Sequence, residues 1–239
     1  MIAFDKIRAR AEARKGGADA LKALLPSVAP QAALAGLGDD RVLAEMTKRI
    51  FCAGFVWRVI DNKWPGFEEA FLGFEPKPLL FQPDEFWHDR TRDGRIVKHP
   101  MKIKSVRENA AFVSDIAAEH GSFGKFLAAW PIDDQAGLMD FIGKRGSRLG
   151  GRTGQYFLRF VGFDGFITAR DTVAALRDGG LDVAAEPTSK GDIRKIQEVF
   201  NRWAKETGLP RVHISRICAM SIGENYDAET LMRNGGGDE

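Results

Sequence analysis

The sequence of 239 residues has little of what disulfide-stabilised proteins depend on. It contains two cysteines, Cys52 and Cys218, and each lies within an apolar pattern of helical spacing. Two cysteines without a CxxC pair are too few for a disulfide framework. We therefore expect both to be buried free thiols.

Long hydrophobic runs are also missing. No stretch is long enough to cross a bilayer, and Asp5 and Arg8 follow Met1 where a signal peptide would have its apolar segment. The expectation is a cytoplasmic protein without a membrane partner. Strand-like alternation and internal repeats are absent too, so the sequence predicts an all-α chain.

Apolar residues at helical spacing are abundant. The apolar content of 44% is ample for a packed core. A stripe that includes Val42, Met46 and Ile50 predicts a core helix that starts near Asp39. The clearest amphipathic helix is predicted over residues 190–207, with Gly208 and Pro210 ending it.

Positive charge is concentrated in the middle of the chain. The net charge is only +2, but residues 90–107 carry seven Lys or Arg against one acid. Residues 144–170 carry six against one. This distribution suits a polyanionic partner such as nucleic acid.

Residues 146–151, which we call the glycine turn, separate two predicted helices. Gly150 and Gly151 permit the positive φ of a sharp hairpin, and the next helix would present unpaired N–H groups at its start. Four basic residues surround this point: Lys144, Arg145, Arg148 and Arg152. The pattern predicts a phosphate site. The alternative is an ordinary helix connection on a solvated basic face.

Two motifs around the glycine turn resemble those of the helix-hairpin-helix DNA glycosylases. They are Leu149-Gly-Gly-Arg-Thr and, after an apolar helix ending at Gly162, Arg170-Asp-Thr-Val. The resemblance implies that the hairpin binds a DNA backbone phosphate, often with a monovalent cation. The residues that would do so are Arg148, Gly150, Gly151, Arg152 and Thr153. It also implies that Asp171 is the catalytic carboxylate.

The run Ala53-Gly-Phe-Val-Trp, with its aromatic continuation to Phe74-Glu-Pro, resembles the bacterial 3-methyladenine DNA glycosylase I family. By that resemblance Trp57 is a stacking platform for an extruded base and Phe55 is a candidate wedge in the duplex. Stacking on an aromatic face recovers about 1–3 kcal/mol per base. Arg49 stands where the family has a base-reading glutamate, so the base pocket must differ at that edge. The alternative is that Trp57 and Phe55 are core aromatics.

The resemblance also implies a two-lobed helical fold. Residues 39–181 would form the lobe with the hairpin, and residues 1–38 would pack with residues 182–233 as the other lobe. Residues 234–239 are expected to be a disordered tail. The structural zinc of the 3-methyladenine enzymes is not expected, because the four histidines are scattered and lack the spacing.

The implied activity is that of a monofunctional DNA glycosylase that removes a damaged, 3-methyladenine-like purine from double-stranded DNA as a monomer. Bifunctional members have a lysine before the hairpin threonine, whereas this chain has Arg152, which stays protonated and cannot form a Schiff base. Asp171 could instead be only the N-cap of its helix. The whole chain could instead be a non-catalytic DNA-binding protein, or a helical protein with a basic face and no nucleic-acid role.

Overall fold

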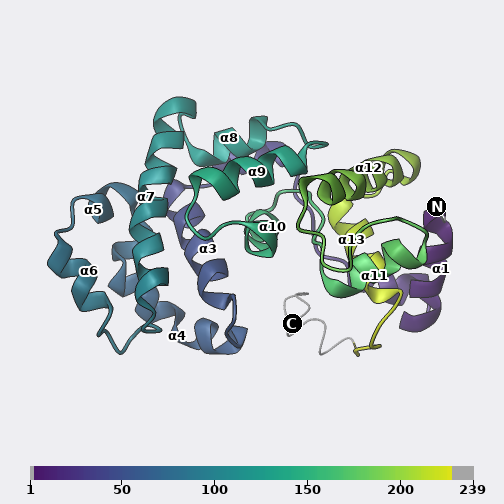
Figure 1. Ribbon diagram of the computed structural model, residues 1–239, viewed down its shortest axis with the longest axis horizontal. Helices are drawn as coiled ribbons and strands as arrows, with labels where there is room; N and C mark the ends of the chain where they lie inside the picture. Colours follow the sequence, from purple (N-terminus) through teal and green to yellow (C-terminus); the bar gives the residue numbers. More distant parts are fainter. Residues whose placement is uncertain (1–2, 228–239) are drawn as a thin grey trace. The chain divides into compact units, whose positions relative to one another are not determined.

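The computed structural model describes residues 3–227, and within this range every regular element is a helix (Figure 1). The all-α prediction is therefore confirmed. The expected tail, residues 234–239, lies outside the described residues.

The chain divides into two compact units. Unit 1 takes its described residues from Met1–Val28, Ile132–Ala136 and Asp164–Glu239, and unit 2 consists of Ala29–Pro131 and Gly137–Phe163. These bounds differ from the expected lobes at three places. Residues 29–38 lie in unit 2 rather than with the N-terminus, and residues 132–136 and 164–181 lie in unit 1 rather than with the hairpin.

Unit 2 is built around one apolar core. Its central helices α3 and α7 pack side by side (Figure 1). The stripe predicted in the first of these is confirmed, since Val42, Met46 and Ile50 are at most 2% exposed. The elements of this unit are η1 (Gln31–Gly36), α3 (Asp39–Cys52), α4 (Trp57–Ala70), η2 (Leu72–Phe74), α5 (Pro76–Leu80), α6 (Asp84–Arg90), α7 (Pro100–His120), α8 (Phe123–Ala129), α9 (Gln135–Arg145, of which the first two residues belong to unit 1) and α10 (Gly151–Phe160).

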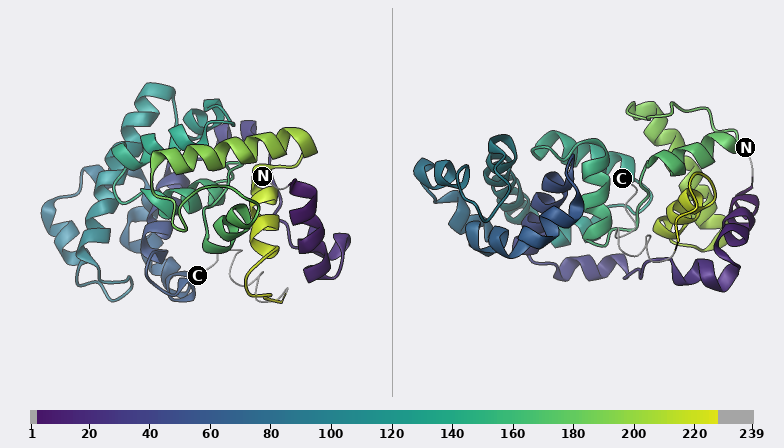
Figure 2. Two further views of the ribbon diagram at one scale, coloured as in Figure 1. Left: turned by 45° about the vertical axis from the view of Figure 1, so that its right-hand side comes forward. Right: turned by 90° about the horizontal axis from the view of Figure 1, so that it is seen from below.

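Unit 1 joins the described N-terminal and C-terminal helices, and α1 lies beside α13 (Figure 2). Its helices are α1 (Phe4–Lys15), α2 (Ala18–Ala23), α11 (Arg170–Asp178), α12 (Lys190–Thr207) and α13 (Arg211–Met220). The bounds of α12 match the prediction, and Gly208 ends it in the left-handed conformation at φ 70°. Arg10 connects α1 to α11 through an ion pair of 2.6 Å with Asp178.

Both cysteines are buried free thiols, as expected. Burial raises the pKa of Cys52 to about 11 and that of Cys218 to about 12. None of the helices within residues 3–227 is both long enough and apolar enough to cross a membrane.

Candidate functional site

Three aromatic side chains gather in unit 2 where α4 begins beside α10. The Trp57 ring lies 5.3 Å from the Tyr156 ring and 5.9 Å from the Phe160 ring, both in edge-to-face geometry. Tyr156 and Phe160 are four residues apart, so they share one face of α10. Trp57 is half-buried and Phe160 is 38% exposed. This aromatic cluster therefore reaches the surface, and Trp57 is not an ordinary core residue.

Arg49 lies under the aromatic cluster. Its guanidinium carbon is 4.0 Å from the centre of the Phe160 ring and 4.9 Å from that of Trp57, within cation–π range of both. One turn earlier on α3, Glu45 forms an ion pair of 2.6 Å with Arg49 Nε. Burial raises the pKa of Glu45, although the charge of Arg49 opposes this. Two residues one turn apart thus bring a charge pair, with Arg49 buried and Glu45 partly buried, to the aromatic cluster.

Lys102 fixes the segment that leads into Trp57. Its Nζ donates to the carbonyls of Phe51 at 3.2 Å and Ala53 at 2.6 Å. Both carbonyls lie at the C-terminal end of α3, where the helix dipole favours a positive charge. Burial, together with the charge of Arg148, lowers its pKa to about 8. The side chain is only 4% exposed, so Lys102 belongs neither to a phosphate-binding surface nor to a solvated helix face.

Phe55 lies at the tip of the segment that Lys102 holds. It is 38% exposed and Val56 is 58% exposed, so the reading of Phe55 as a core aromatic is wrong. The ammonium of Lys102 is 4.5 Å from the Phe55 ring centre. Two exposed apolar side chains on a short loop offer the shape of a wedge, and that role stays a prediction.

The glycine turn bends differently from the expectation. Gly151 has a φ of 58°, as predicted, but Gly150 is extended at φ −75° and is the N-cap of α10. The second left-handed residue is Arg148 at φ 59°, a conformation that costs a non-glycine residue about 1 kcal/mol. Gly150, Gly151 and Arg152 are exposed, and Thr153 is half-buried. The turn therefore presents both backbone and the Arg152 side chain at the start of α10.

Asn109 holds the glycine turn against α7. Its amide donates to the Ser147 carbonyl at 3.0 Å and accepts from the Ser147 N–H at 2.8 Å. Leu149, at 1% exposure, anchors the other side of the turn in the apolar core. Asn109 itself is fully buried, so this pair of hydrogen bonds is protected from water.

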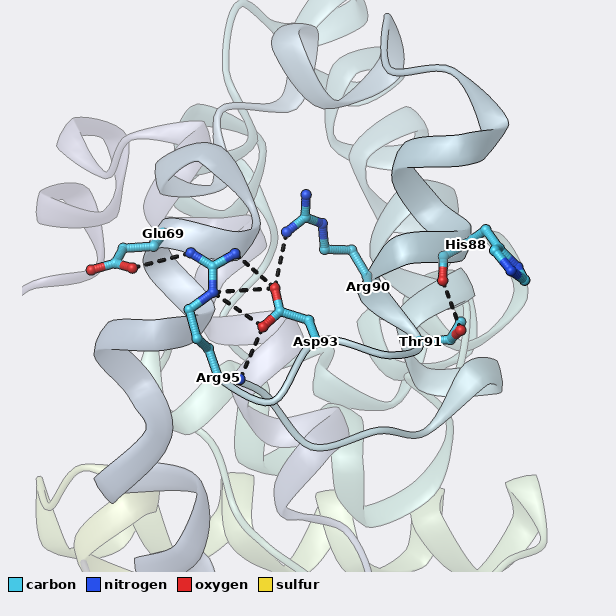
Figure 3. Close-up of polar contacts among 6 residues, drawn as sticks. All are labelled: Glu69, His88, Arg90, Thr91, Asp93 and Arg95. Carbon is cyan, nitrogen blue, oxygen red and sulfur yellow. Dashed lines mark hydrogen bonds and ion pairs between the residues drawn. The ribbon is translucent and has the colours of Figure 1, made fainter.

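Most of the basic stretch 90–107 is used within the fold. The Asp93 carboxylate binds Arg95 at 2.7 Å and Arg90 at 3.0 Å, and Arg95 also reaches Glu69 (Figure 3). The hydrogen bonds from Arg95, together with Arg90, hold the pKa of Asp93 well below its usual range. Arg107 pairs with Asp84. These ion pairs stabilise the loop between α6 and α7. Because the arginines are already paired within the protein, they give little support to a separate polyanion site.

The basic residues at the glycine turn differ in their pairing. Lys144 and Arg145 form ion pairs with Asp140 and Glu119. Arg148 and Arg152 have no ion-pair partner within the described part of the chain. These two guanidinium groups are the ones available to an incoming anion.

Asp171 lies in unit 1, in the first turn of α11. Its helix begins at Arg170 with Ala169 as the N-cap, so the alternative reading of Asp171 as an N-cap is wrong. The residue is 7% exposed, and Arg170 Nε lies 3.3 Å from its Oδ1. Gly223 packs so closely that a β-carbon there would be 2.5 Å from Asp171 Oδ2. The carboxylate is thus confined by a neighbouring backbone at the N-terminal end of α11.

No group of His, Cys, Asp or Glu within residues 3–227 is arranged to hold a metal ion.

Residues 36–138 match the family model of methyladenine glycosylase. This stretch resembles the methyladenine glycosylases. The resemblance inferred from the Ala53–Trp57 segment is thereby confirmed for the methyladenine-glycosylase-like region, which holds α3, α4 and α7. It ends before the glycine turn and Asp171, so the roles of both stay predictions.

Solved structures similar to the chain are also 3-methyladenine DNA glycosylases. A variant of the Staphylococcus aureus enzyme I is 25% identical, and the similarity covers 53% of this chain and 78% of that one at a TM-score of 0.47. A 3-methyladenine DNA glycosylase I in complex with 3-methyladenine is 21% identical, covering 62% and 84% at a TM-score of 0.48. No curated protein matches.

The sequence reading missed several residues of the site. Tyr156 and Phe160 lie in what the sequence showed only as an apolar helix, and Glu45 was not predicted as a site residue. Their spacing of four residues, with Glu45 one turn before Arg49, was the available signal. The contacts of Asn109 and Lys102 could not be predicted from the sequence, because their partners are backbone groups distant in sequence.

Proposed function

We propose that the protein is a monofunctional DNA glycosylase of base excision repair that hydrolyses the N-glycosidic bond of a damaged, 3-methyladenine-like purine. The match of residues 36–138 to methyladenine glycosylases carries this proposal. The aromatic cluster with the Glu45–Arg49 charge pair supports it, because an extruded base needs a stacking surface beside polar groups that can recognise its edge.

In this proposal the damaged nucleotide leaves the duplex and its base stacks against Trp57. Phe55 and Val56, exposed on the loop held by Lys102, fill the gap that the base leaves in the stack. Stacking offsets part of the unpairing cost, which is lowest for damaged bases. The rigid anchoring of the loop by two hydrogen bonds keeps the wedge in place during extrusion.

Asp171 supplies the negative charge that bond cleavage requires. The C1′–N bond breaks with its electron pair leaving on the base, and the sugar becomes oxocarbenium-like. A fixed carboxylate stabilises that positive charge. Water then adds its hydroxyl to C1′, and its proton passes to the departing base or to Asp171. The products are a free base and an abasic site.

The glycine turn anchors the DNA backbone. Exposed amides at the start of α10, assisted by Arg148 and Arg152, bind a phosphate. A monovalent cation, if bound, would be held by the backbone of residues 146–151 and would add positive charge for the phosphate. No lyase step follows, because Arg152 cannot act as an amine nucleophile. Double-stranded DNA as partner, the monomeric state and the cytoplasmic location complete the proposal.

The decisive test is a panel of duplexes that each carry one lesion, incubated with the protein and scored for free base by mass spectrometry. Release of at least one damaged purine without strand cleavage is expected. Strand cleavage at the abasic site would contradict the monofunctional assignment, and failure to release any base would contradict the enzyme assignment.

A non-catalytic DNA-binding protein is the second candidate. The close approach of Gly223 to Asp171, which leaves the carboxylate only 7% exposed, favours it. Duplex binding with a steep salt dependence but without base release would support this alternative. Absence of duplex binding at low salt would leave a helical protein without a nucleic-acid role.

A further inference from the structure

The segment that follows α13 lies against the carboxylate of Asp171. This segment, residues 221–227, contains no helix, and we call it the strap. A β-carbon on Gly223 would lie 2.5 Å from Asp171 Oδ2 and 2.8 Å from Oδ1, so no further heavy atom fits between the strap and the carboxylate there. Asp171 is 7% exposed, whereas its neighbour Arg170 is exposed. The strap thus helps to bury a carboxylate that stands next to the surface.

Helix α1 holds the strap in this position. Arg14 donates from Nε to the carbonyl of the last residue of α13 at 3.1 Å, and from Nη2 to the Gly223 carbonyl at 2.7 Å. Lys15 Nζ donates to Asn225 Oδ1 at 2.8 Å and to the Tyr226 carbonyl at 2.6 Å. In return, the Asn225 amide donates to the Arg14 carbonyl at 3.1 Å. These hydrogen bonds, most of which have a charged donor, form a latch between α1 and the strap.

The strap is held at the surface rather than in the core of unit 1. Residues 223–227 are all exposed, and they extend from Ser221, which is buried and donates from Oγ to the Cys218 carbonyl at 2.8 Å. Segments with exposed hydrogen bonds and few buried apolar contacts open at the lowest cost. The strap can therefore leave Asp171 while Ser221 stays anchored and the helices of unit 1 stay packed.

The charge of the strap opposes that of DNA. The strap contains Glu224 and Asp227 and has no lysine or arginine. In the proposed reaction the deoxyribose comes into contact with Asp171, and the phosphates on either side of the sugar approach with it. Acidic side chains beside the carboxylate repel those phosphates, and Gly223 fills space that the sugar needs. A latched strap and a sugar bound at Asp171 therefore exclude each other.

We propose that the strap is an autoinhibitory cover of Asp171, latched by Arg14 and Lys15 of α1, and that a DNA strand displaces it on binding. The proposal rests on the proposed glycosylase function, because it concerns access of the deoxyribose to the carboxylate. Opening the strap lowers the net affinity for DNA. The low exposure of Asp171 then describes the DNA-free protein and no longer favours a non-catalytic one.

Two substitutions release the strap from opposite sides of the latch. Lys15→Met removes the hydrogen bonds to Asn225 and Tyr226 together with one positive charge. Asn225→Ala removes the contacts with Lys15 and with the Arg14 carbonyl without a change of charge. Both variants should bind a duplex that carries a single tetrahydrofuran residue, a sugar without a base, about tenfold more tightly than the wild type.

The matched control is Lys6→Met, since Lys6 is an exposed lysine of the same helix. Loss of a cation ordinarily weakens DNA binding, so Lys6→Met should bind no more tightly than the wild type. Tighter binding by Lys15→Met is therefore the opposite of what its charge alone predicts. Melting temperatures show that each variant is folded, and Asn225→Ala keeps the test valid if Lys15→Met is not.

Limited proteolysis reports the position of the strap without any reaction. Chymotrypsin cleaves after Tyr226 in the strap and after Phe81, which is 85% exposed in unit 2 and serves as the internal reference. The ratio of the two cleavage rates, measured by mass spectrometry, should rise about tenfold in Lys15→Met and Asn225→Ala. It should also rise when the tetrahydrofuran duplex is added to the wild type, and Lys6→Met should keep the wild-type ratio.

The outcomes separate this inference from the proposed function. Unchanged affinity and unchanged cleavage after Tyr226 in the folded variants would overturn the cover, and so would equal tightening in Lys6→Met. Methylated duplex DNA scored for free base tests the glycosylase function: Asn225→Ala should release base about tenfold faster below saturation and at the wild-type rate at saturation. Release of no base by any of the proteins, with strap opening as expected, would overturn the glycosylase assignment alone.

Discussion

Asp171 is a carboxylate held by contacts from both sides. Gly223 closes on one oxygen and Arg170 lies near the other, while the start of α11 favours the negative charge. Asp171→Asn keeps the size of the side chain and removes the charge. Base release should fall at least about a hundredfold with duplex affinity nearly unchanged.

The matched control for that substitution is Asp178→Asn on the same helix, which removes an exposed carboxylate paired to Arg10. It should retain full base release. Single-turnover excision and equilibrium binding on the same duplex separate the two effects. Full activity of Asp171→Asn on a lesion that the wild type excises would show that another group stabilises the sugar.

Lys102 makes the free energy of unfolding depend on pH in the alkaline range. Its pKa falls from 10.5 to about 8 on folding, chiefly because of burial. Below about pH 8 both states are protonated, and the cost of burying the charge is fully present. Between about pH 8 and 10.5 the unfolded chain binds more protons than the folded one, so the free energy of unfolding rises with pH.

The difference in unfolding free energy between wild type and Lys102→Met should therefore increase by up to about 3 kcal/mol across that window. Urea denaturation at several pH values measures it. The two buried thiols titrate in both proteins, and the difference removes their contribution. A difference that stays constant from pH 7 to pH 11 would mean that Lys102 is not desolvated.

At the scale of elements, the glycine turn depends on a side chain from another helix. Asn109→Ala removes both hydrogen bonds to Ser147 and leaves its partly buried N–H and carbonyl unpaired, so stability should fall by about 1–3 kcal/mol and duplex affinity with it. Ser147→Ala is the control, because it keeps both backbone bonds and loses only the Oγ bond to Glu108. Thermal unfolding and binding isotherms of both variants check this. Equal losses of stability and affinity in the two variants would show that the Asn109 hydrogen bonds do not hold the turn.

Gly150 allows the phosphate proposal to be tested without damage to the fold. Its φ of −75° suits any residue, and a β-carbon there would meet nothing within 4 Å. Gly150→Val should keep the melting temperature and weaken binding to all duplexes alike by about tenfold, since the side chain would stand before the amides of α10. Gly94→Val, at an equally open position, should not affect binding. Unchanged affinity of Gly150→Val would place the phosphate elsewhere.

For the whole molecule, a net charge of +2 means that DNA affinity must come from the distribution of charge. Each phosphate that a protein neutralises contributes about −0.9 to the slope of log K against log salt. Arg152→Gln should reduce the magnitude of that slope by about 0.9. Arg107 is already paired with Asp84, so Arg107→Gln should leave the slope unchanged. Titrations of an undamaged duplex at several salt concentrations measure both, and the reverse result would move the interface to residues 90–107.

The sequence by itself determined the all-α class, the stripe of α3, the bounds of α12 and the resemblance to methyladenine glycosylases. These features depend on the periodicity of apolar residues and on motifs that are contiguous in the chain, so the local sequence is enough to predict them. Reasoning from the local sequence failed where the same residue type can take more than one structural role. The cap of α11 fell on Ala169 rather than Asp171, and Asp93 absorbed the charges of Arg90 and Arg95 that looked free for DNA.

Only the tertiary structure decided which side chains meet. It brought Tyr156 and Phe160 to Trp57, buried Arg49 beneath them, and turned Lys102 and Asn109 onto backbone groups far away in the chain. Those partners are carbonyls and amides that every residue possesses, so no residue type marks them in advance. These contacts matter because they are buried: a polar atom without water must find its hydrogen-bond partner within the protein or lose stability.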